Sequence, residues 1–106
     1  MINIKEWLET TGLSVAETYF KKATKLPYII FIIDENNSGA DNQLCICDRD
    51  ITVEVYSDII NREKEKLIED LLKEKSINYS KSRTWIDSEK FFQTSYDFNL
   101  YEKMEV

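Results

Sequence analysis

Apolar residues recur at helical spacing near the start of the chain. Ile4 and Leu8 are four positions apart, Asn3 stands where a capping residue is favoured, and Gly12 follows where a left-handed residue ends a helix. The pattern predicts a short amphipathic helix over residues 1–12.

Residues 59–75 give the clearest helical pattern in the sequence. The stripe consists of Ile60, Leu67, Ile68, Leu71 and Leu72. Charged residues, Glu65 among them, fill the other positions, and we interpret them as a solvated face. The segment is therefore predicted to be a helix with one apolar side.

A continuous apolar run and an alternating segment predict the first pair of strands. The run lies in residues 27–34, and residues 44–56 alternate, with Ile51 and Val53 on one face. Residues 35–43 are polar and contain Gly39, so we expect a long acidic loop between antiparallel strands.

Residues 77–101 predict a second hairpin, because two strand-like runs flank a polar turn and the last run alternates between apolar and polar positions. Residues 13–26 are ambiguous. Ser14 and Glu17 fit a capping box that would open a helical turn, but we favour a mostly irregular arm.

The order of elements is helix, strand, strand, helix, strand, strand. The simplest arrangement that buries every apolar stripe is a single α+β domain over residues 1–106. We expect a four-stranded antiparallel sheet with both helices packed on one face. Neither an internal repeat nor a linker interrupts this pattern.

Composition narrows the possible chemistry. The 106 residues include no His, which excludes catalytic triads that use it and most zinc sites. We expect neither an enzyme nor a bound cofactor. The net charge is −6, and residues 34–58 hold seven acidic side chains against one Arg, so specific nucleic-acid binding is not expected.

Cysteines and apolar runs give expectations about the compartment. Cys45 and Cys47 are too close in sequence for an ordinary structural disulfide, and we interpret them as reduced thiols that pack in the core. The longest apolar run, residues 28–33, is too short to cross a bilayer, and the N-terminus lacks a signal-peptide pattern. We therefore expect no membrane partner and no export.

Two kinds of residue are candidates for a site. Asp48 and Asp50 could be imagined as carboxylate ligands for Mg²⁺, but a bend where polar groups reach solvent explains them better, and we predict no metal site. Trp85, Phe91 and Tyr101 lie near strand ends, where aromatic side chains can anchor a partner surface as well as the core.

The succession of segments resembles one family. It consists of Leu26–Phe31, Ser38–Asn42, Ile51–Tyr56, the amphipathic helix, and Ser88–Glu89 followed by Phe92–Gln93 and Tyr96–Phe98. In this order and spacing the chain is similar to the small tail terminator, or tail completion, proteins of long-tailed phages and prophages.

The resemblance implies a structural protein that forms a hexameric ring on the end of the tail tube and ends its polymerisation. Its implied partners are further copies of itself, the tail tube protein and the head connector protein. Its implied locations are the host cytoplasm during assembly and the virion tail. In such a ring an acidic loop could face the DNA channel or a partner, and the candidate residues are Asp34, Glu35, Ser38, Gly39, Asp41 and Asn42.

Other functions fit the same residues. Another head-tail connector or completion protein would leave a similar pattern. A small acidic inhibitor or regulatory binding module could use the charge of residues 34–58 to mimic nucleic acid. A metal-dependent nuclease would need Asp34, Asp48, Asp50 or Glu54 to converge.

Overall fold

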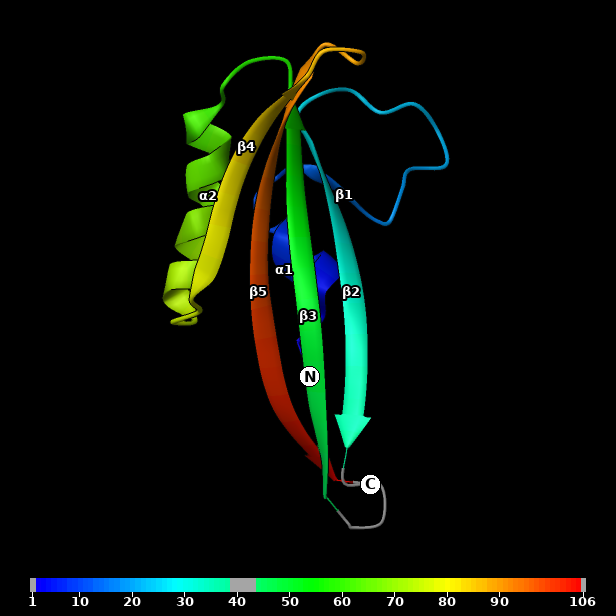
Figure 1. Ribbon diagram of the computed structural model, residues 1–106, viewed down its shortest axis with the longest axis vertical. Coiled ribbons are helices and arrows are strands. Elements are labelled where there is room, and N and C mark those ends of the chain that lie inside the picture. Colours follow the sequence, from blue (N-terminus) through cyan, green and yellow to red (C-terminus); the bar gives the residue numbers. More distant parts are fainter. Residues whose placement is uncertain (1, 39–43, 106) are drawn as a thin grey trace.

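The fold is a single sheet with helices beside it. The computed structural model describes residues 2–38 and 44–105. Within these residues the strands form one five-stranded sheet in the order β1-β2-β3-β5-β4 (Figure 1). The elements are α1 (Ile4–Glu9), β1 (Ser14–Glu17), β2 (Tyr28–Ser38), β3 (Leu44–Ser57), α2 (Arg62–Glu74), β4 (Tyr79–Ile86) and β5 (Phe91–Glu105).

The predicted four-stranded antiparallel sheet is wrong, because a fifth strand makes the sheet mixed. Strand β1 lies where we expected an irregular arm over residues 13–26, and it pairs with β2 in parallel, with Val15 opposite Ile29. The strand ends at Glu17, and the next residue, Thr18, has a left-handed φ of 68°. A four-residue strand with one buried apolar side chain, Val15, gives too little alternation to be recognised in a sequence.

Hydrogen exchange can test the added strand. The Thr18 amide donates a hydrogen bond to the Phe31 carbonyl at 2.9 Å, as a continuation of the β1–β2 pairing. We expect this amide to exchange at least about 100-fold more slowly than the Thr24 amide in the following connection, because sheet amides open only with larger unfolding events. Amide-resolved exchange measured by NMR provides the comparison, and equal rates at Thr18 and Thr24 would contradict the strand.

The first hairpin is longer than the sequence predicts. Strand β2 continues to Ser38 and β3 begins at Leu44, so residues 35–38 of the expected loop over 35–43 are strand, and residues 39–43 lie outside the described residues. Strand β5 continues past the expected end at Tyr101 and pairs with β3 as far as Leu44 opposite Glu105. Backbone pairing on both sides of β3 stabilises polar segments that have no apolar alternation of their own.

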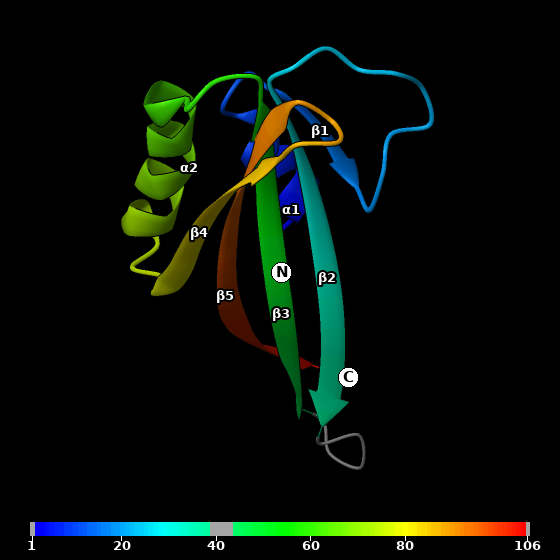
Figure 2. The ribbon, with the colours of Figure 1, turned by 45° about the horizontal axis from the view of Figure 1, so that its top comes forward.

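The molecule is elongated, with extents of 49 × 29 × 22 Å. Two views show both helices beside one half of the sheet, while β2, β3 and β5 continue well beyond them (Figures 1 and 2). We call this extension the projection, and it comprises residues 34–38, 44–50 and 99–105. None of the described helices is long and apolar enough to cross a membrane.

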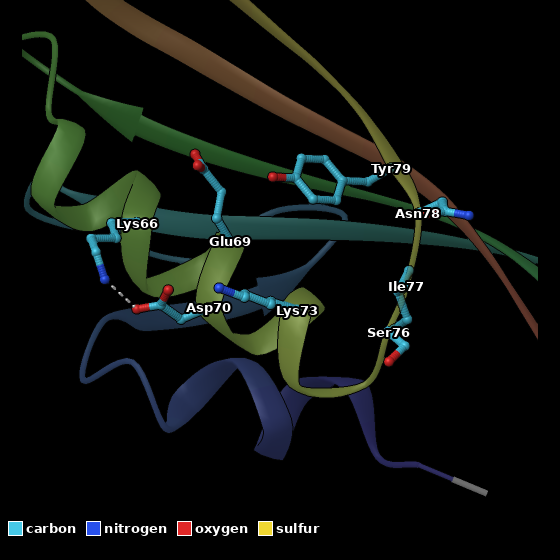
Figure 3. A pocket seen from close by; sticks show the side chains of 8 residues that line it. All are labelled: Lys66, Glu69, Asp70, Lys73, Ser76, Ile77, Asn78 and Tyr79. Carbon is cyan, nitrogen blue, oxygen red and sulfur yellow. Dashed lines mark hydrogen bonds and ion pairs between the residues drawn. The ribbon is translucent and has the colours of Figure 1, made fainter.

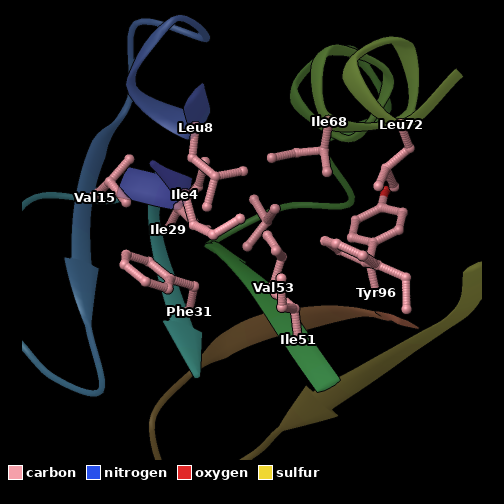
Figure 4. Close-up of a cluster of buried hydrophobic side chains, with 12 residues drawn as sticks. Ile4, Leu8, Val15, Ile29, Phe31, Ile51, Val53, Ile68, Leu72 and Tyr96 are labelled. Atoms are coloured by element: carbon pink, nitrogen blue, oxygen red, sulfur yellow. The ribbon is translucent and has the colours of Figure 1, made fainter. Parts of the chain in front are cut away.

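The hydrophobic core lies between both helices and one face of the sheet (Figure 4). On that face Phe31 is opposite Val53, which is opposite Tyr96, so three neighbouring strands present one apolar row. Helix α1 contributes Ile4 and Leu8, and α2 contributes Ile68 and Leu72, to the same buried cluster. Burial of these stripes, rather than the intrinsic stability of short helices, holds α1 and α2 in place.

Candidate functional site

The face of the sheet opposite the helices carries a set of carboxylates. Alternation along the strands points even-numbered residues of β2 and β3, and odd-numbered residues of β5, away from the core. We call this surface the acidic face, and its carboxylates belong to Asp34, Asp48, Asp50, Glu54 and Asp97. Among the side chains described on this face there is no Lys or Arg, so the described part of the face carries only negative charge.

Neutral donors hold three of these carboxylates in position. The Asn99 amide nitrogen donates to Oδ1 of Asp48 at 2.5 Å and to Oδ1 of Asp50 at 2.8 Å, and the Thr52 hydroxyl donates to Asp97 at 2.7 Å. A hydrogen bond from a neutral group orients a carboxylate without cancelling its charge. The acidic face therefore keeps a fixed arrangement of negative groups.

Glu54 is held in the same way. Its two oxygens accept hydrogen bonds from the Tyr56 hydroxyl and the Gln93 amide, each at 3.0 Å. Burial and the charge of Glu54 raise the pKa of Tyr56 to about 12, against a smaller opposing effect of the Gln93 hydrogen bond. Tyr56 consequently remains a neutral donor at physiological pH.

A row of aromatic rings borders the acidic face. Phe20 contacts Tyr28, Tyr28 stacks on Tyr56, and Tyr56 meets Phe91 edge-on, with ring centroids 5.1, 5.2 and 5.0 Å apart. Contacts of this geometry add about 0.5–1.5 kcal/mol per pair beyond the buried area. The row fixes the connection after β1 against the sheet through Phe20.

The opposite side of the molecule holds a buried ion-pair network centred on Glu65 of α2. Arg83 Nε and the Thr94 hydroxyl donate to Oε2 of Glu65 at 2.8 and 2.9 Å, and Lys81 Nζ lies 3.0 Å from its Oε1. Burial alone would raise the pKa of Glu65, but the hydrogen bonds from Arg83, Lys81 and Thr94 outweigh it and lower the pKa to about 2. The network joins α2 to β4 and β5, so its role is structural.

The predicted solvated position of Glu65 is therefore wrong, since the residue is only 2% exposed. The sequence did carry a signal for this burial, because Glu65, Ile68 and Leu72 share helical spacing. Its cationic partners could not be identified without the position of β4 beside α2.

A surface hollow lies between the second half of α2 and the start of β4 (Figure 3). Three of its four charged side chains are engaged: Lys66 pairs with Asp70 at 2.8 Å, and Glu69 accepts hydrogen bonds from Lys81 and from the buried Tyr96 hydroxyl. This arrangement ties a helix to a strand and gives no nucleophile activated by a neighbouring base. The lining residues are Lys66, Glu69, Asp70, Lys73, Ser76, Ile77, Asn78 and Tyr79.

The acidic residues predicted for a loop are in part strand residues. Asp34 and Glu35 belong to β2, where consecutive side chains point to opposite faces, so they do not act together on one loop. Ser38 is the last residue of β2. Gly39, Asp41 and Asn42 lie outside the described residues.

The three aromatic candidates do not form a common patch. Trp85 is 42% exposed on β4 and packs on Phe92, with ring centroids 4.8 Å apart, on the helix side of the sheet. Phe91 is half-buried in the aromatic row. Tyr101 is 71% exposed and lies ten positions after Phe91 on β5, in the projection.

The predicted absence of a metal site stays a prediction. Within the described part of the chain, no group of three or more His, Cys, Asp or Glu side chains is placed to hold a metal ion. Asp48 and Asp50, the pair considered from the sequence, share the Asn99 amide as a donor. The Cys45 and Cys47 side chains fall outside the described set.

Comparison with known proteins shows a likeness of fold. No protein-family model matches the chain, and no curated protein sequence is similar to it. A chain from a solved structure of the virion of a native gene transfer agent particle has a similar fold, with a TM-score of 0.60. The match covers 92% of this chain and 84% of that chain at 10% sequence identity, so what the two share is the fold.

Proposed function

We propose that the protein is a structural component of a phage or phage-like virion and has no catalytic role. The observation that carries this proposal is the fold match to a virion chain, because it extends over nearly the whole length of both chains. The resemblance of the sequence to phage tail proteins supports the same assignment independently of the fold.

Within that class we propose the tail terminator role: an oligomeric ring on the tail tube, hexameric in the assembled tail, that also contacts the head connector. The projection supports assembly, since β1 pairs only with residues 28–31 of β2 and β4 only with residues 91–98 of β5. The remainder of each strand leaves one backbone edge that no described strand covers. Free edges of this kind allow neighbouring subunits to pair.

Another head-tail connector or completion protein is the nearest alternative, and a small acidic binding module is the other. The acidic face favours the binding module, because carboxylates with no Lys or Arg beside them among the described side chains can imitate the phosphates of nucleic acid. Such a module would bind a basic partner as a monomer or dimer, whereas a terminator would add to tail tubes.

Electron microscopy of purified tail tubes mixed with the protein tests the assignment. We expect added density at one end of the tubes, and shorter tubes when tube protein polymerises in its presence. An unrelated small protein of similar acidity is the control for adhesion by charge. Tubes with unchanged ends and lengths would contradict the terminator role, and density along tube walls or on head connectors would indicate a different virion component.

A further inference from the structure

The connection between β1 and β2 is strongly basic. Residues 18–27, which we call the basic arm, contain Lys21, Lys22 and Lys25 and no acidic residue. All three lysines are exposed, and none makes an ion pair with any described residue. Both ribbon views show the arm looping outward beside β2, at the end of the sheet opposite the projection (Figures 1 and 2).

The acidic face has the complementary property. Its five carboxylates accept hydrogen bonds from neutral groups or from none, and no ion pair within the described residues neutralises them. The arm and the face of one chain therefore carry opposite charges that no ion pair among the described residues compensates. Apolar groups accompany both surfaces, because Tyr19 on the arm and Ile32 on the face are exposed.

We propose that the basic arm of one copy of this chain docks on the acidic face of a second copy. This proposal deepens the proposed function, on which it rests, by naming the surfaces through which subunits of the ring meet. The two surfaces are different patches of one molecule, so the contact is heterologous, and repeated heterologous contacts close into a ring when the rotation between neighbouring subunits divides a full turn. Because a net charge of −6 makes copies repel one another in general, a stable contact needs such a local match.

Zero-length cross-linking with a carbodiimide tests the contact directly, because the reagent joins a lysine to a carboxylate only when the two touch. An equimolar mixture of unlabelled and ¹⁵N-labelled protein at millimolar concentration separates links between copies from links within one copy. We expect mass spectrometry to find mixed-isotope links from Lys21, Lys22 or Lys25 to Asp50, Glu54 or Asp97. These links should largely disappear in about 1 M salt, where the Debye length falls to about 3 Å.

A charge exchange gives the second test. The arm variant carries Lys21→Glu and Lys22→Glu, and the face variant carries Asp50→Lys and Asp97→Lys. Each variant alone places like charges at the exchanged positions of the contact, so we expect oligomers and mixed-isotope links to be lost. In an equimolar mixture the altered arm can meet the altered face, so that the exchanged positions again carry opposite charges, and the unaltered arm can meet the unaltered face. We expect alternating oligomers to form again, as native mass spectrometry can show.

Matched controls change the same charges elsewhere. Lys5→Glu with Lys75→Glu, and Glu63→Lys with Glu74→Lys, alter exposed residues outside both surfaces and should leave assembly unchanged. Circular dichroism checks that every variant is folded.

The outcomes separate this contact from the proposed function. Wild-type protein without mixed-isotope links between arm and face, or a variant mixture that fails to assemble, would overturn the contact. Protein that adds to tail tubes but cross-links through other residues would overturn the contact and leave the terminator role standing. Oligomers that are linked from arm to face but do not bind tail tubes or head connectors would support the contact and contradict the terminator role.

Discussion

Replacing Glu65 with Gln is expected to lower the free energy of unfolding at neutral pH by about 3 kcal/mol. The pKa of this carboxyl is lowered from 4.5 to about 2 in the folded chain, and each pKa unit corresponds to about 1.4 kcal/mol. Gln keeps the size of the side chain but removes the charge that Arg83 and Lys81 neutralise. The melting temperature of a domain of this length should fall by roughly 15 °C.

The effect should depend on pH in a defined direction. A carboxyl whose pKa is depressed by folding contributes its full stability above its unfolded pKa and loses it as pH falls through its folded pKa. The difference in unfolding free energy between the two proteins should therefore be complete above about pH 5 and shrink steadily toward about pH 2.

Denaturant unfolding followed by tryptophan fluorescence, repeated across this pH range, measures the difference. Glu63→Gln is the matched control on the same helix, because the Glu63 side chain is 85% exposed and its replacement should change stability by less than about 0.5 kcal/mol. A difference between wild type and Glu65→Gln that stays constant with pH would show that the ion pairs do not stabilise the fold.

Elements with a strong local period could be predicted, and those held by pairing with distant segments could not. The apolar stripe of α2 and the alternation of β5 are visible in sequence because burial on one side imposes a period. Strand β1 has only Val15 as a buried apolar residue. Its parallel register with β2 depends on the path of the connection over residues 18–27. The polar end of β2 is a strand because β3 supplies its hydrogen-bonding partner.

The candidate surfaces were also predictable only as far as they depend on residues that are close together in the sequence. The excess of acidic residues between positions 34 and 58 was visible in the sequence, but the acidic face also contains Asp97 of β5, which pairs with Thr52 of β3. The β3–β5 register decides which carboxylates lie on the same face. It brings together residues such as Thr52 and Asp97, which are 45 positions apart in the sequence. The lysines of the basic arm were not singled out in the sequence, because the acidic surface that complements them is formed only when β2, β3 and β5 pair.

Replacing Leu8 with Ala is expected to cost about 3 kcal/mol of unfolding free energy, within the usual range of about 2–5 kcal/mol for a buried leucine. Leu8 has no exposed surface and projects from α1 into the core beside Val15 and Ile29 (Figure 4). Truncation removes its transfer free energy and leaves a cavity. A six-residue helix has little stability of its own, so α1 depends on this contact.

Ile59→Ala is the matched control, because Ile59 is a similarly large aliphatic residue that is exposed before α2, and its truncation should cost less than about 1 kcal/mol. Unfolding of both variants in urea, followed by circular dichroism and by fluorescence, gives the two free energies. Coincident transitions in the Leu8→Ala protein would show that α1 unfolds with the sheet as one unit. A cost as small as that of Ile59→Ala would instead mean that α1 does not pack on the sheet. Only α2 would then cover that face of the sheet.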